Sequence, residues 1–142
     1  MYRSRFLFNY LITYEYGGEP ISIFTLYRAF QDYNWIIRGF INIFDGILFF
    51  YRNGIINGNI HVDNILFQEE GSSNWRMINF DVELKPEEDK LLIDINNLLE
   101  IVNDLLEGSI ISEVRFVMID SATDEIFKDI RTRMTALLKQ NE

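Results

Sequence analysis

The fold of this chain is decided by a polar loop that leads into an apolar strand, residues 57–67, which read Asn57-Gly58-Asn59-Ile60-His61-Val62-Asp63-Asn64-Ile65-Leu66-Phe67. A second short motif follows it, Met77-Ile78-Asn79-Phe80-Asp81. Residues 65–68 and 75–79 have the composition of short strands, and the turn residues at 71–74 predict that they are joined as a hairpin. The loop therefore places several amide side chains and the single histidine of the chain directly before a strand.

Working outward from the loop, apolar residues at spacings of three and four predict helices on both sides. The first runs from Trp35 to Tyr51 and ends at Asn53-Gly54. The second begins after Pro86, where acidic residues favour a helix start, and runs to about Glu107. The last is predicted to begin at Ser121 as its N-cap and to carry one apolar face, formed by Ile126, Ile130, Met134 and Leu137.

Three further segments are less regular. Residues 3–15 alternate loosely and predict one or two strands, which residues 17–20 interrupt. Ser22 is a candidate N-cap for a helix to about Asp32. Residues 114–119 fit either a strand or a buried helix.

Composition limits the class of protein. The chain has 142 residues, 48% of them hydrophobic, which predicts one modest globular domain with its own core. It contains no cysteine and one histidine, so disulfides, thiolate metal sites and histidine-rich metal sites are excluded. Residues 81–142 carry a net charge of −8, against −1 for residues 1–80, and this acidity argues against nucleic acid as a partner. No apolar run is long enough for a membrane span, and we expect an intracellular protein, cytoplasmic or nuclear.

The loop and the motif after it resemble the catalytic loop and the metal-binding segment of the protein kinase superfamily. Residues 8–21 resemble the last strand of the kinase N-lobe and the hinge, and Asp94 matches the buried aspartate that holds the kinase catalytic loop from below. The branch stays open among haspin-like, KEOPS-kinase-like and lipopolysaccharide-kinase-like members. The resemblance implies one α+β domain over residues 1–142, a mostly helical kinase C-lobe with short β-hairpins. Residues 1–18 would be the last N-lobe strand and the hinge, and residues 19–142 would form the C-lobe. The N-lobe would be largely absent.

This sequence departs from the kinase pattern at the positions that carry chemistry. Asn57 stands for the leading histidine of the loop, Asn59 for the catalytic aspartate and Asn79 for the metal-binding aspartate, while Asn64 keeps a residue suited to its role. An amide lacks the charge that favours Mg²⁺ and does not accept a proton as a carboxylate does. No Gly-rich phosphate loop is present in the sequence. We therefore expect no catalytic residue, no metal site and no cofactor, with weak residual binding of ATP and Mg²⁺ left open.

The expected function is that of a pseudokinase, which acts through protein–protein contacts as a scaffold, an allosteric regulator or a decoy of a kinase pathway. The partner would be another protein, such as a kinase, or a second copy of the chain. The alternative is an atypical kinase that is active only when a partner supplies the missing lobe. A third interpretation is a helical interaction module that only imitates the motifs, and it predicts that Asp94 does not contact residues 57–64.

Two polar residues and one apolar surface have expected structural or binding roles. Asp94 is expected to be a structural anchor, since a carboxylate in an apolar helix stripe needs backbone N–H partners. His61 is expected to orient the loop as a hydrogen-bond donor rather than act as a base. An N-terminal surface that lacks sheet neighbours is the candidate partner-binding surface, formed by Phe6, Phe8, Tyr10, Ile12 and Tyr14.

Overall fold

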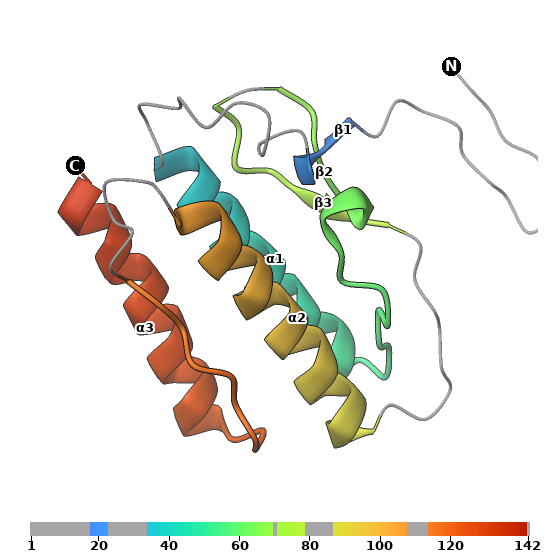
Figure 1. The fold of residues 1–142 in the computed structure, drawn as a ribbon. Coiled ribbons are helices and arrows are strands. Elements are labelled where there is room, and N and C mark those ends of the chain that lie inside the picture. Colours follow the sequence, from blue (N-terminus) through green and yellow to red (C-terminus); the bar gives the residue numbers. More distant parts are fainter. Residues whose placement is uncertain (1–17, 23–33, 70, 79–86, 108–113, 142) are drawn as a thin grey trace, which may run out of the picture.

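The structure, a computed structural model, describes residues 18–22, 34–69, 71–78, 87–107 and 114–141. The described residues form an α+β fold with three α-helices and one small antiparallel sheet (Figure 1). The elements are β1 (Glu19–Pro20), α1 (Asn34–Arg52), the 3-10 helix η2 (Val62–Asn64), β2 (Ile65–Phe67), β3 (Arg76–Met77), α2 (Glu88–Leu106) and α3 (Asp124–Asn141). The strands predicted within residues 3–15 lie outside the described residues, as does the helix predicted after Ser22.

Helix α1 packs against both α2 and α3 (Figure 1). Its apolar stripe is buried as the spacing predicts, with Phe40 and Phe44 almost inaccessible to water. Phe44 meets Phe127 of α3 edge to face, with ring centroids 6.3 Å apart, a favourable arrangement for two aromatic rings. The helix ends as predicted, because Gly54 takes a positive φ of 84° and its N–H donates to the carbonyl of Tyr51.

The bounds of α2 agree with the prediction, whereas the start of α3 does not. The predicted N-cap Ser121 lies three residues before the first helical residue, Asp124. The hydroxyl of Thr123 accepts a hydrogen bond of 3.2 Å from the Ile126 N–H instead. Thr123 is therefore the residue that satisfies the first turn, and its carbonyl already accepts from the Phe127 N–H. The predicted apolar face of α3 is present, with Ile130, Met134 and Leu137 buried.

The sheet has the strand order β1-β2-β3, with β2 in the centre. The predicted hairpin is confirmed, since Ile65 pairs with Met77 and Leu66 pairs with Arg76. Strand β1 was not predicted: Glu19 pairs with Phe67, in a stretch whose glycines and proline indicate a break. Proline is tolerated at this place because β1 forms the edge of the sheet.

The hairpin is fastened to α1 by Trp75. This indole is buried against the rings of Trp35 and Phe40, and its Nε1 donates to the carbonyl of Ser72. The ring lies directly on Gly39 of α1, where even a Cβ atom would collide with it. A residue without a side chain at position 39 is therefore what allows the hairpin to lie so close to the helix.

Residues 114–120 are neither a strand nor a helix, although the sequence fitted both. They form an extended segment held by two asparagine side chains of α2. Asn103 accepts from the Phe116 N–H at 2.8 Å and donates to the Phe116 carbonyl at 2.9 Å. Asn96 bonds the N–H and carbonyl of Ile119 in the same way, at 2.8 and 2.9 Å. Side-chain amides thus replace the neighbouring strand that such backbone normally requires.

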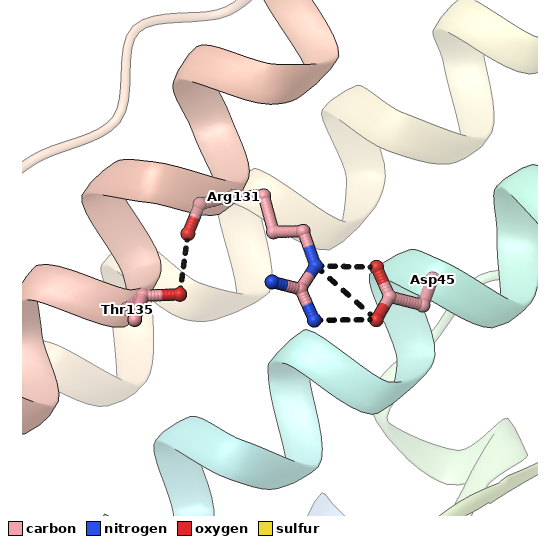
Figure 2. Close-up of polar contacts among 3 residues, drawn as sticks. All are labelled: Asp45, Arg131 and Thr135. Atoms are coloured by element: carbon pink, nitrogen blue, oxygen red, sulfur yellow. Dashed lines mark hydrogen bonds and ion pairs between the residues drawn. The ribbon is translucent and has the colours of Figure 1, made fainter.

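An ion pair at the surface joins α1 to α3 (Figure 2). The Arg131 guanidinium donates to the Asp45 carboxylate through Nε at 3.0 Å and Nη2 at 3.0 Å. This bond raises the pKa of Arg131 above its ordinary value. The Thr135 hydroxyl donates to the Arg131 carbonyl one turn earlier in the helix. Both charged side chains are about half exposed, so water weakens the attraction between them.

Among the helices of the described residues, none combines the length and the apolar character that a membrane crossing requires.

Candidate functional site

The loop of residues 55–64 runs from the end of α1 to β2, and α2 lies beneath it (Figure 1). Asn57, the first candidate residue of the loop, is buried, whereas Asn59 and His61 are exposed. Gly58 has a positive φ of 77° between them, which turns the chain so that its N–H faces the helix. The loop thus exposes its polar side chains on one side and contacts α2 on the other.

Asp94 of α2 holds the loop through the backbone. Its carboxylate is 1% exposed and accepts from the Gly58 N–H, at 3.2 Å through Oδ1 and at 3.3 Å through Oδ2. Burial raises the pKa of Asp94 above its ordinary value, and hydrogen bonds from the backbone of Gly58 and Asn57 partly oppose this rise. The carboxylate is therefore a structural acceptor whose charge is costly where it lies.

Amide side chains brace the loop from within. Asn57 Oδ1 accepts from the Asn59 N–H at 2.7 Å, and Asn64 Nδ2 donates to the Asn59 carbonyl at 3.0 Å. The Asn64 carbonyl accepts from the Ile78 N–H at 2.9 Å, which ties the loop to the residue after β3. Asn57, Asn59 and Asn64 are thus joined by hydrogen bonds that fix the shape of the loop.

His61 begins the 3-10 helix η2 and acts as its cap. Its Nδ1 accepts from the Asp63 N–H at 3.2 Å, so Nδ1 is unprotonated in this arrangement and the ring proton lies on Nε2. The distance of 3.6 Å from Nδ1 to Asp63 Oδ2 is then a close approach and not an ion pair. His61 thus serves as an acceptor through Nδ1 in capping the turn, and its role as a hydrogen-bond donor stays a prediction.

One polar atom of the loop has no partner. Asn57 is 3% exposed, and its Nδ2 forms no hydrogen bond in the part of the chain that the structure describes. A buried donor in this condition costs about 1–3 kcal/mol. The cost is tolerated because the other end of the same amide, Oδ1, accepts the shortest hydrogen bond of the loop described above.

Over the described ranges, no three His, Asp or Glu side chains lie close enough together to bind a metal ion. Asn59 and Asn64 offer neutral oxygens, which hold Mg²⁺ only weakly without a carboxylate. Asn79 lies outside the described residues, and so do the partner-binding candidates Phe6, Phe8, Tyr10, Ile12 and Tyr14.

Asn96 and Asn103 were not among the residues predicted from the sequence, although each anchors a chain segment to α2 as Asp94 does. The available signal was an asparagine on the apolar side of a leucine-rich helix at position 103. Such a residue is buried only where it finds partners. Its spacing of seven from Asn96 places both on one face of the helix.

Comparison of the chain with protein-family models, curated proteins and solved structures finds no significant match to any of them.

Proposed function

We propose that this chain is a catalytically inactive, kinase-like binding protein, which acts through protein contacts as a scaffold, an allosteric regulator or a decoy. The observation that carries the proposal is the neutral loop. Asn59 stands where the kinase resemblance requires a carboxylate, and its own N–H and carbonyl are bound by the amides of Asn57 and Asn64. The loop keeps an ordered shape without the group that would accept a proton from a substrate.

The anchor beneath the loop supports the kinase-like part of the proposal. Asp94 reaches the Gly58 N–H from the helix that follows the hairpin, which is the role that the kinase resemblance implies for it. The interpretation as an unrelated helical module predicts no contact between Asp94 and residues 57–64, and this contact speaks against it. A loop that is anchored but lacks its acidic groups is expected of a protein that has kept the frame and lost the reaction.

Phosphoryl transfer supplies the direct test. The purified chain is incubated with radiolabelled ATP, Mg²⁺ and general protein substrates, alone and with proteins that co-purify with it from the native host. We expect no transfer above background in either condition. Thermal unfolding with ATP and Mg²⁺ is measured alongside, because a ligand that binds only the folded state raises the apparent stability.

Two variants separate the proposal from its alternative, an atypical kinase that a partner completes. Asn59→Ala removes the amide at the catalytic position, and Asn74→Ala removes an exposed amide from the turn between β2 and β3. Neither change should affect labelling by co-purified proteins if this chain is inactive. Transfer that Asn59→Ala abolishes and Asn74→Ala leaves intact would overturn the proposal and establish the kinase.

The N-terminal stretch remains the proposed partner-binding surface, argued from the sequence alone. Light scattering of the full chain and of a variant without residues 1–16 tests this part. We expect the deletion to weaken self-association or capture of co-purifying proteins. A monomeric full chain whose deletion variant keeps every partner would refute this surface without affecting the loss of catalysis.

A further inference from the structure

The extended segment of residues 114–120 is held rigidly on α2 by the ladder of Asn96 and Asn103. The two asparagines are seven residues apart, an advance of about 10.5 Å along a helix. Phe116 and Ile119 are three residues apart and turn the same side of the backbone to α2. This fits an extended backbone with three residues per turn, as in polyproline II, which advances about 9 Å over three residues. Because the two advances are similar, each amide meets one residue of the segment and both of its backbone groups.

The residues between these two tethers are left open. Val117 is 76% exposed and Met118 is 43% exposed, and both are large apolar side chains. Their backbone N–H and carbonyl groups form no hydrogen bond within the described residues. An extended backbone with unpaired polar groups and exposed apolar side chains is what a second extended chain can pair with.

A groove lies beside this open stretch, between the segment and α3. It has a volume of about 460 Å³. Its apolar part is contributed by Phe116, Ile119, Ile126 and Ile130, and Val117 and Met118 also line it. Two chain segments that are distant from the loop of residues 55–64 thus form a hollow with a mixed polar and apolar lining.

The charged side chains that line the groove indicate which kind of ligand it binds. Asp120, Glu125 and Asp129 line it, against the single cation Arg133. Arg133 is already engaged, since its guanidinium carbon lies 4.8 Å from the centre of the Phe116 ring and its Nη2 donates to the Arg115 carbonyl at 2.9 Å. The lining is therefore net acidic, and a cationic ligand is favoured over an anionic one.

We propose that this groove binds an extended segment of a partner protein in which lysine or arginine residues accompany apolar ones. The segment lies along Val117 and Met118, where backbone groups are open to hydrogen bonding, places apolar side chains beside the half-buried Ile119 and Ile126, and directs its cations toward Glu125 and Asp129. This inference does not rest on the proposed function, because neither residues 55–64 nor residues 6–14 take part in it.

The test is a titration followed by amide NMR shifts. One probe is a pool of nine-residue peptides in which lysine or arginine alternates with leucine, valine or phenylalanine, and the other replaces the cations by glutamate or aspartate. We expect the basic pool to shift the amides of Val117 and Met118 in a saturable way and the acidic pool to leave them unchanged. Absence of shifts with the basic pool, equal shifts with both pools, or shifts confined to other parts of the chain would overturn the proposal.

Charge-reversal variants distinguish the groove from general attraction to an acidic protein. Glu125→Lys with Asp129→Lys should weaken binding of the basic pool by at least about tenfold. The matched control reverses two exposed acidic residues elsewhere, Glu69→Lys in the turn between β2 and β3 with Asp104→Lys on α2. It changes the net charge equally and should leave the affinity within about twofold. Equal losses in both double variants would contradict a specific groove.

Discussion

Two sides of the molecule are fastened to α2 by buried polar side chains, and they use different chemistry. On the loop side, residues 55–78, the fastener is the charged Asp94, which accepts from the Gly58 N–H. On the α3 side, residues 114–141, the fastener is the neutral Asn103, which both accepts from and donates to Phe116. An amide satisfies both backbone groups of one residue without carrying charge into the interior, whereas a carboxylate accepts only and loses its hydration.

The two fasteners differ in their energetic cost. The raised pKa of Asp94 shows that its environment disfavours the charged form. Such a group can hold a loop that is half exposed, where water still reaches part of the backbone. Asn103 is buried with both of its partners, and only a neutral group with two-way hydrogen bonding suits that place.

The largest effect is expected from Asn103→Leu, which leaves the Phe116 N–H and carbonyl without partners. At about 1–3 kcal/mol for each of the two buried groups, the loss of unfolding free energy should be about 2–6 kcal/mol. Urea denaturation measures it. Asn97→Leu is the matched control, because the half-buried Asn97 makes no hydrogen bond within the described residues through its side chain. Equal losses in the two variants would show that the ladder does not hold the α3 side.

The next largest effect is expected from Gly39→Ala, which tests how strongly the loop side depends on the packing of Trp75 against α1. Gly39→Ala places a Cβ in the Trp75 ring and should lower the free energy of unfolding by about 1–3 kcal/mol, despite the better helix propensity of alanine. Gly46→Ala, seven residues later in α1, meets only the flexible end of Met77 at 3.0 Å and should be neutral or stabilising by up to about 1 kcal/mol. Intrinsic Trp fluorescence reports the displacement of Trp75. A stable Gly39→Ala variant with unchanged fluorescence would contradict the close packing.

The pH dependence of stability tests the cost of the charged fastener. Asp94 has a raised pKa in the folded state, so the folded chain binds this proton more tightly than the unfolded chain does. Its contribution is then most favourable below its ordinary pKa of 3.8 and is lost as the pH rises through the folded pKa. Asp94→Asn removes this titration while keeping one oxygen acceptor.

We therefore expect the stability of the original chain, relative to Asp94→Asn, to fall as the pH rises from the acid limit of the folded state and to level off above the folded pKa. Urea denaturation of both proteins over a series of pH values gives the difference directly, and it cancels the other acidic groups. A difference that increases with pH would mean that the loop stabilises the carboxylate instead.

The smallest effect is expected at the surface of the α3 side. Arg131→Ala removes a two-pronged ion pair with Asp45, and both side chains are about half exposed. Exposed pairs contribute up to about 1 kcal/mol, so the loss should not exceed this and should shrink in high salt. A double-mutant cycle with Asp45→Ala measures the coupling. A coupling energy larger than the loss of unfolding free energy in Asn103→Leu would contradict the expectation that the surface ion pair contributes less than the buried asparagine.

Much of the fold could be predicted from the sequence because it depends on local pattern. The stripe from Trp35 to Tyr51 fixes α1, since apolar residues at helical spacing can be buried only on a helix. Gly54 ends it because a positive φ suits glycine. The hairpin of β2 and β3 follows from two short β-forming runs around a turn.

The candidate site could be predicted only in part. A carboxylate among leucines must find N–H donors, and the resemblance to kinases implies that they belong to the loop; the Gly58 N–H fits that expectation. The acceptor role of His61, and an Asn57 Nδ2 without a hydrogen-bond partner among the described residues, follow from backbone geometry that no residue pattern encodes.

Residue type and spacing within single segments are enough to predict α1, α2, the apolar face of α3, the hairpin and the amide-rich loop. The pairing of β1 with β2, the contact of Trp75 with Gly39 and the tethering of residues 114–120 by two asparagines emerge only in the folded molecule. Each of these features joins segments that are distant along the chain. Their partners are chosen by packing and by the need to satisfy buried backbone groups, which no single segment specifies.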